Sequence, residues 1–404
     1  MPTGTSGGPQ RHWLLRLVIA FAFAQAAVSM ARPAVSYRAL ALGADERAVG
    51  VIAGVYALLP LFAAVPLGRR TDHGRCAPLL PAGVALIAAG CALSGTADSL
   101  TAIAAWSAVM GLGHLCFVIG AQSLVARQSA PEDQDRNFGH FTIGASLGQL
   151  IGPIGAGLVV SGQGAELART SALALLVAAI TGAVGLSSLW RVEHRAPAGP
   201  APARSAPVPV HRILRTRGVP GGIVISLAVL SATDVLTAFL PVVGEERGIS
   251  PLAVGLLLSL RAAATIACRL VITPMIRIVG RTTLLVTSCL LAGVLCAGVA
   301  LPVPVWGLAL MLALLGFCLG VGQPLSMTTV VQAAPPGARS TALALRLTGN
   351  RLGQVAAPAA AGLVAGVAGA AAPFVLLGVL LFASAGLALP PRGKPGGGAR
   401  PLDD

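Results

Sequence analysis

The chain has 404 residues, of which 55% are hydrophobic and only 10% carry a charged side chain. Soluble domains carry roughly 25% charged residues, so this composition excludes an ordinary water-facing surface and places most of the chain in lipid. The formal net charge of +14 does not indicate nucleic-acid binding, because the basic residues are scattered between apolar runs rather than gathered on one face.

Twelve apolar runs follow one another along the chain, each close to the ~20 residues that a helix needs to cross a bilayer. Six lie in the first half, at residues 14–34, 48–67, 78–97, 100–121, 138–160 and 170–189. Six lie in the second half, at residues 221–243, 252–271, 283–300, 305–325, 341–367 and 373–389. The sequence therefore predicts an all-α membrane protein with twelve transmembrane helices.

An internal repeat divides these helices into two sets of six. The stretch GASLGQLIGPIGAGLV at residues 144–159 returns as GNRLGQVAAPAAAGLV 205 positions later, and GADERAVG at residues 43–50 returns as GISPLAVG at the same offset. Each copy lies six helices after the first, so the two halves run in the same direction. We expect six-helix bundles at 1–190 and 219–389, a linker rich in Pro, Ala and Arg at 191–218, and a tail at 390–404.

The placement of Arg and Lys predicts the orientation of the chain. With the first residue in the cytoplasm, the inner segments carry most of the basic residues, as the positive-inside rule requires. Five arginines are then left to the outer segments: Arg32, Arg38, Arg47, Arg169 and Arg247. Both termini are therefore expected in the cytoplasm. The alternative is a cleavable signal at the first apolar run, which would leave eleven spans.

The stretch GRRTDHGR at residues 68–75 joins the second and third helices on the inner side. It resembles the G-x-x-x-D-R-x-G-R loop of the major facilitator superfamily, with Gly68, Asp72, Gly74 and Arg75 at matching places and one residue missing after Asp72. The resemblance implies that this loop locks the two halves together. A carboxylate there has Arg partners and helix N-termini to pair with. The alternative is a solvated turn.

The stretch GHFTIGASLGQLIGPIGAG at residues 139–157 resembles the helix-five motif of the antiporter branch of the same superfamily. Matching residues are Gly139, Gly148, Gly152, Pro153 and Gly157. Small residues at these spacings allow close helix packing, and an internal proline removes a backbone hydrogen bond and bends the helix. We expect a bent helix suited to rocking of the halves; ordinary helix packing is the alternative.

Four charged residues are predicted inside spans: Asp234, Arg261, Arg346 and Arg351. Each would cost ~2.5–3.5 kcal/mol if it faced lipid, so we expect them to line a wet cavity or to pair. The working hypothesis is that Asp234 loads and releases a proton, while Arg261 or Arg351 modulates it or binds an anionic group of the substrate. A static ion pair is the alternative.

Uncharged polar residues extend this set of cavity candidates. Gln149 and Gln354 occupy equivalent places in the repeat, where they serve either the substrate or helix packing. Asn350 accompanies Arg351, and His114 lies in the fourth predicted helix. No cysteine or histidine spacing is typical of a metal site, so no metal or cofactor is expected.

The resemblance implies a fold of the major facilitator type, a bacterial inner-membrane location and alternating access by rocking of the halves. No G-x-x-x-x-G-K-[ST] loop is present, so the energy is expected from a gradient. We expect a monomer that exports small apolar or amphipathic compounds in exchange for protons, although the fourth helix has Ser107 where such exporters often carry Arg and the first helix has no carboxylate.

Two other functions stay open at this stage. The three intramembrane arginines favour an importer or symporter of a small anionic metabolite. A membrane-bound sensor or enzyme would need clustered nucleophiles, bases or metal ligands, and the sequence offers no such cluster.

Overall fold

The computed structural model describes residues 10–73, 78–129, 133–189, 192, 210–216, 218–335 and 339–388. Within these ranges every regular element is a helix, as predicted for an all-α membrane protein. Eleven helices are long and apolar enough to cross a membrane, and a shorter apolar helix at Ala372–Leu387 supplies the twelfth expected span.

The described part of the first half contains seven α-helices and one short 3₁₀ helix. They are α1 (Gln10–Ala41), α2 (Glu46–Val55), α3 (Leu58–His73), α4 (Leu79–Thr96), α5 (Leu100–Gln128), α6 (Gln134–Val159), α7 (Ala165–Val184) and η2 (Gly185–Leu189). The second predicted span is divided into α2 and α3, which are separated by Tyr56 and Ala57. The carbonyl oxygen of Tyr56 lies against the α-carbon of Gly111 on α5, where no side chain would fit.

The second half contains six long helices, preceded by one short helix in the predicted linker. They are α8 (Val210–Leu214), α9 (Val219–Glu246), α10 (Pro251–Val279), α11 (Arg281–Val299), α12 (Val305–Ala333), α13 (Arg339–Ala368) and α14 (Ala372–Ala388). The end of the linker is thus not irregular. Ile213 of α8 is fully buried in a small cluster with Val219 and Val330, which secures the linker to the second half.

The expected end of the first span is wrong, because α1 continues past Pro33 to Ala41. Arg32 and Arg38 therefore lie inside a helix rather than in an outer loop. Arg38 is buried and donates hydrogen bonds to the main-chain oxygens of Ala97 and Ala168. A buried guanidinium is stable when its donors are satisfied in this way, and the sequence alone does not reveal such partners.

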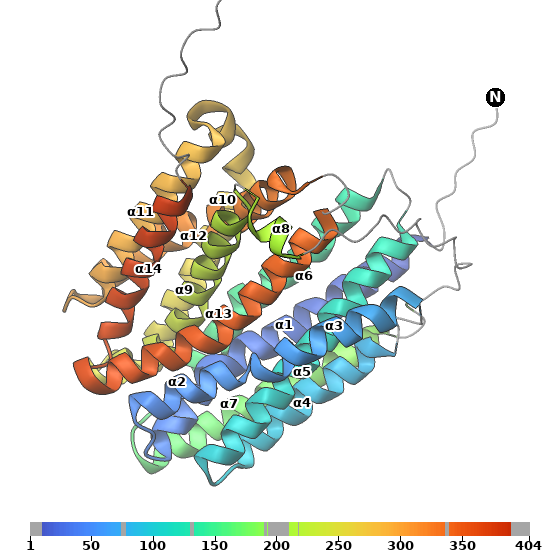
Figure 1. Ribbon diagram of the computed structural model, residues 1–404. Helices are drawn as coiled ribbons and strands as arrows, with labels where there is room; N and C mark the ends of the chain where they lie inside the picture. The colour runs from blue at the N-terminus through green and yellow to red at the C-terminus, as the bar shows by residue number, and fades with distance from the viewer. Residues whose placement is uncertain are drawn as a thin grey trace, which may run out of the picture.

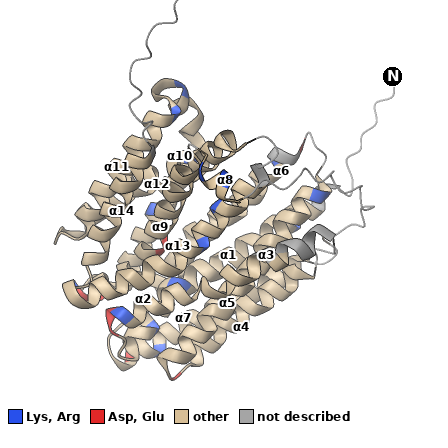
Figure 2. Cartoon of the chain, in the orientation of Figure 1, with Lys and Arg blue, Asp and Glu red and all other residues tan. Residues whose placement is uncertain are grey.

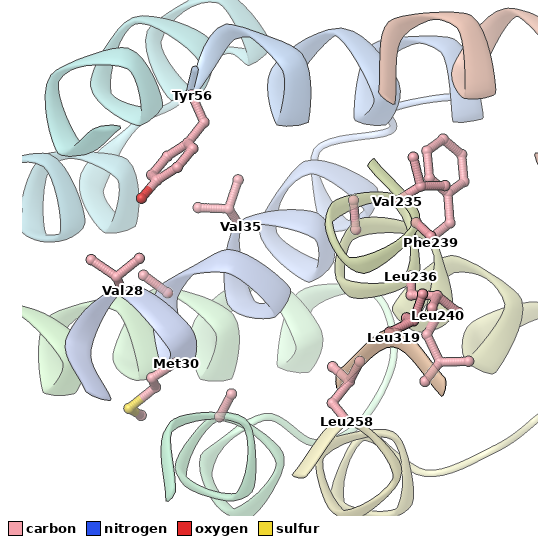
Figure 3. Packing of buried hydrophobic residues seen from close by; sticks show 14 of the residues in the cluster. Val28, Met30, Val35, Tyr56, Val235, Leu236, Phe239, Leu240, Leu258 and Leu319 are labelled. Carbon is pink, nitrogen blue, oxygen red and sulfur yellow. The ribbon is translucent and has the colours of Figure 1, made fainter. Parts of the chain in front are cut away.

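The two halves lie side by side and use α1 and α9 as their central helices (Figure 1). In α9, 72% of the apolar window is buried, against 33% in α6 and in α7, which have one face toward lipid. Figure 3 shows how the centre is packed: Leu236 and Leu240 of α9 lie close to Leu258 of α10. Figure 2 shows helices that are almost free of charge along their length, as expected of a chain in lipid.

The repeat is visible in how the second span of each half begins. Asp45 caps α2 by accepting a hydrogen bond from the Ala48 amide, and Ser250 caps α10 by accepting one from the Ala253 amide. The two caps are 205 positions apart, the offset of the sequence repeat. The same local structure therefore starts equivalent helices in the two halves.

Candidate functional site

The two halves meet through glycines near the end of the molecule where α1 ends and α2 begins, here called the closed end. A β-carbon at Gly157 of α6 would lie 2.6 Å from the Pro251 oxygen of α10, and one at Gly54 of α2 would lie 2.6 Å from the Val355 oxygen of α13. Real β-carbons do not approach so closely, so these contacts require glycine. In Figure 1, α2 and α13 lie side by side at this end.

The closed-end contacts are made by equivalent residues of the two halves. Gly50 of α2 packs on the Pro358 oxygen of α13, and Gly255 of α10 packs on the Pro153 oxygen of α6. Both members of each contact recur 205 positions later or earlier. The two halves are therefore joined twice by the same glycine-to-backbone contact.

The residues of the helix-five motif have different roles in α6. Gly148 and Gly152 face α1 of the same half: a β-carbon built at either position would lie 2.6 Å from atoms of Gln25, Ala26 or Ser29. Of the motif residues, only Pro153 and Gly157 contact the other half. Gly139 is exposed and has no neighbour within 4 Å of a β-carbon. The motif thus holds α6 against α1 along most of its length and joins the halves at its end.

The predicted loop at residues 68–75 is helical up to His73, and the rest of it lies outside the described part of the chain. The helix α3 continues to His73, so the backbone at Gly68 and Asp72 is helical. The side chains at these two positions, and residues Gly74 and Arg75, lie outside the description. The expectation that they lock the halves stays a prediction.

A buried ion pair joins the halves near the middle of the molecule. Arg32 of α1 donates to Oδ1 of Asp234 on α9 at 2.6 Å, and the Asp234 side chain is only 4% exposed. Nε2 of Gln354 on α13 donates to Oδ2 of Asp234 at 2.8 Å, and Arg351 donates to Oε1 of Gln354 at 2.9 Å. Asp234 thus has a partner on both carboxylate oxygens, and the main partner is one that the sequence analysis assigned to a loop.

A chain of neutral polar groups continues from this ion pair into the first half. The guanidinium carbon of Arg32 lies 5.2 Å from the centre of the Tyr56 ring, a cation–π distance. The Tyr56 hydroxyl is 2.8 Å from Nδ1 of His114, and Nε2 of His114 is 3.1 Å from Oε1 of Gln25. Nε2 of Gln25 donates to the Ser29 hydroxyl at 3.1 Å.

These contacts assign the proton positions on the neutral imidazole. The Gln25 oxygen only accepts, so Nε2 of His114 carries the hydrogen and Nδ1 accepts from the Tyr56 hydroxyl. His114, a cavity candidate from the sequence, is therefore tied to α1 and to the α2–α3 break. We call this set of linked residues the central network; its members are Gln25, Ser29, Arg32, Tyr56, His114, Asp234, Arg351 and Gln354.

The remaining candidates separate into bonded and unbonded groups. Arg346 donates to the main-chain and side-chain oxygens of Gln323 at 3.1 and 2.6 Å, so it braces α13 on α12 and is not bonded to Asp234. Gln149 is exposed and has no hydrogen bond with any described residue, unlike its repeat partner Gln354. Asn350 is 6% exposed, and its Oδ1 has no donor among the described residues.

Among the described residues, Arg261 of α10 has neither an ion pair nor a side-chain hydrogen bond. Its Nε is fully buried without a hydrogen-bond acceptor in the described part of the chain, while its charge interacts with those of Asp234 and Arg32. A small cavity of about 20 Å³, enough for about one water molecule, lies beside Arg32 and Tyr56 on the closed side of the network. Within the described ranges, no group of three or more His, Cys, Asp or Glu is close enough to hold a metal.

The sequence model of the family described as Major Facilitator Superfamily matches residues 17–245 and 222–404. A curated relative, the inner membrane transport protein YajR of Escherichia coli (strain K12), is 28% identical over 157 residues. That alignment covers 37% of this chain and 33% of the relative. The chain is thus compared with about a third of that protein's length.

Solved structures with the same fold cover nearly the whole chain. A bacterial homologue of the human lysosomal transporter Spinster, in an inward-facing and unoccupied conformation, has a TM-score of 0.77 at 14% identity, with 95% of this chain and 97% of that chain covered. A variant of the nucleoside transporter NupG has 0.77 at 15% identity, with 93% and 99% covered. A POT family transporter with a thioalcohol-conjugated peptide has 0.77 at 16% identity, with 95% and 96% covered.

Proposed function

This chain belongs to the major facilitator superfamily, and from that premise we propose that it exports small apolar or amphipathic compounds in exchange for protons, by alternating access. The observation that carries the proposal is the Arg32–Asp234 ion pair, which is buried and connects the central helices of the two halves. Asp234 is the group that takes up and releases the proton. We further propose that the chain is a monomer with no enzymatic activity and no cofactor.

Protonation of Asp234 changes how strongly the halves hold each other. While the carboxylate is ionised, it compensates the charge of Arg32 in a site where an uncompensated charge costs several kcal/mol. A neutral Asp234 leaves three guanidinium groups, those of Arg32, Arg261 and Arg351, without a counter-ion among the described residues. The resulting repulsion favours a state in which α1 and α9 separate.

The orientation of the chain gives this motion a direction. We propose a bacterial inner membrane with both termini in the cytoplasm, so that the closed end faces outward. Described arginines at the opposite end include Arg127, Arg136, Arg212, Arg215, Arg277 and Arg281, a distribution in line with the positive-inside rule. In this orientation the protein has its outer side shut, and protonation of Asp234 from outside requires the other state.

The experiment that tests the proposal compares the unmodified protein with Asp234→Asn. Expressed in a pump-deficient bacterial host, the unmodified protein raises the minimum inhibitory concentration of one or more amphipathic drugs, and Asp234→Asn does not. In inverted vesicles, addition of such a drug releases protons from the acidified lumen only when Asp234 is present. Proton-driven transport at the normal rate in Asp234→Asn would remove Asp234 from the mechanism.

A second candidate function is the import of a small anionic metabolite. The observation that favours it is the excess of buried guanidinium groups over carboxylates around Asp234. The direction of the proton gradient separates the two: an exporter accumulates its compound in inverted vesicles acidified inside, whereas a symporter accumulates it in right-side-out vesicles acidified outside.

A further inference from the structure

The centre of the protein has more positive charge than its own carboxylate neutralises. Around Asp234 lie the guanidinium groups of Arg32, Arg261 and Arg351, and each interacts electrostatically with the Asp234 carboxylate. Only Arg32 has an ion pair with it. The remaining two charges lie inside spans, where each costs ~2.5–3.5 kcal/mol unless something compensates it.

Arg261 is not required by the packing of its helix. Its carbonyl oxygen lies against Gly316 of α12, as the carbonyl of Tyr56 lies against Gly111 of α5, and both members of the contact are 205 positions apart. The first half thus makes the same backbone contact with a neutral tyrosine. A guanidinium in the second half therefore serves something other than the fold.

Arg261 also lies at the depth of the ion pair. Counted from the closed ends of their helices, Arg32, Arg261 and Asp234 lie roughly 14–18 Å along the axis, at 1.5 Å per residue, about half the thickness of a bilayer core. Arg351 is bonded through a single donor to Gln354. Arg261 therefore keeps donors available at the level of the ion pair, and Arg351, about 25 Å from the closed end of α13 by the same count, keeps donors deeper in the protein.

From these contacts we propose that the transported compound carries an oxyanion, a carboxylate or a phosphate, which Arg261 and Arg351 bind in competition with Asp234 for the local positive charge. The inference rests on the second candidate function, symport of an anion with a proton, and names its substrate class: an amphipathic organic anion. Asp234 acts as the internal counter-ion while the site is empty. Arrival of the external anion releases Asp234 from that role and allows it to be protonated, so the anion and the proton bind together, which is the coupling of a symporter.

Binding of defined probe anions tests the inference without any gradient. Purified full-length protein in lipid nanodiscs is titrated with salicylate, octanoate and phenyl phosphate, each against a neutral counterpart: salicylamide, octanamide and phenol. The shift in unfolding temperature, followed through the four tryptophans, gives the affinity, because a ligand that binds only the folded state stabilises it. We expect at least one anion to bind with saturation and its neutral counterpart to bind at least tenfold more weakly.

Four variants locate the site. Arg261→Gln lowers the affinity for the anion about 10- to 100-fold, the loss expected for one charge-assisted contact. Arg261→Tyr, which introduces the repeat-equivalent residue, lowers the affinity to the same extent while the protein stays folded. Asp234→Asn strengthens anion binding, because the internal competitor is gone. Arg247→Gln is the control, since Arg247 is bonded at the closed end to the main-chain oxygens of Val299, Ala300 and Leu301, and it leaves anion affinity unchanged.

The outcomes separate this inference from the transport proposal. If no anion stabilises the protein more than its neutral counterpart, or if Arg261→Gln binds anions normally, the inference is wrong. Proton-driven transport of tetraphenylphosphonium, unchanged in Arg261→Gln, contradicts the anion site but leaves proton-coupled export intact. Anion binding that depends on Arg261, without any flux driven by a pH gradient in proteoliposomes, supports the site and contradicts proton coupling.

Discussion

The closed end and the central network differ in how closely they follow the internal repeat. At the closed end, Gly50 with Pro358 and Gly255 with Pro153 are copies of one contact. In the centre, Ser29 corresponds to Asp234 and Tyr56 to Arg261, so a neutral residue in the first half is the repeat equivalent of a charged one in the second. Packing between the halves constrains both copies equally, whereas the site for chemistry needs only one charged set. The backbone contacts therefore stayed alike while the polar centre diverged.

The largest effect on stability is expected from removing the Arg32–Asp234 ion pair of the central network. Arg32→Gln or Asp234→Asn alone leaves one buried charge unpaired and costs about 3–5 kcal/mol. The double variant recovers part of that loss, because both members of the pair are gone while Arg261 and Arg351 keep their charges. Unfolding temperatures of the four proteins in one detergent measure the coupling, and additive losses would contradict a direct pair.

The two repeat-equivalent glutamines are the next contrast. Gln354→Ala removes the donor to Oδ2 of Asp234 and is expected to destabilise the protein by about 1.5–3 kcal/mol, the range for hydrogen bonds to charged groups. Gln149→Ala changes an exposed side chain and should stay within about 0.5 kcal/mol. Equal effects on the unfolding temperature would mean that the centre is as symmetric as the closed end.

The equivalence of the two glycine contacts at the closed end is tested by matched glycine variants. Gly50→Ala and Gly255→Ala each place a β-carbon against main-chain atoms of the other half, at a cost of about 1–3 kcal/mol to the closed state. We expect both to slow transport by a similar factor, about 10- to 100-fold, and to raise the labelling of cysteines placed at the closed end. Gly139→Ala, which meets nothing within 4 Å, is the control. A large effect from only one of the pair would show that the two contacts are not equivalent.

The smallest effect is expected in the neutral part of the network. Tyr56→Phe keeps the ring beside Arg32 but removes the hydrogen bond to His114, and should lower stability by about 0.5–1.5 kcal/mol. Anion affinity should not change, since no charge is removed. A loss of affinity as large as that of Arg261→Gln would mean that the first half takes part in binding directly.

The sequence is a good guide to the fold because lipid imposes a simple rule on spans. Runs of apolar residues and an offset of 205 positions are enough to predict twelve helices in two related halves. The break between α2 and α3 was not predicted, because apolar residues continue across Tyr56 and Ala57. Hydropathy predicts which residues lie in lipid, but it does not predict where a helix is interrupted.

The candidate site was only half accessible from sequence. Asp234 and Gln354 were identified as a charge inside a span and as a repeat-equivalent polar residue, and the structure brings them into contact. Arg32 was missed because it lies at the end of the predicted run at residues 14–34 and was counted with the arginines of the outer segments. Its partner lies 202 positions away, and no local pattern reports a contact at that distance.

The interruption at Tyr56 and Ala57 has a mechanical consequence. It divides one span into a segment, α2, that rests on α13 of the opposite half, and a segment, α3, that rests mainly on α5 of its own half. The corresponding span α10 is a single rod of 29 residues. The interruption therefore lies between the contact with the opposite half and the contact with the same half, at a place where the second half has an unbroken helix.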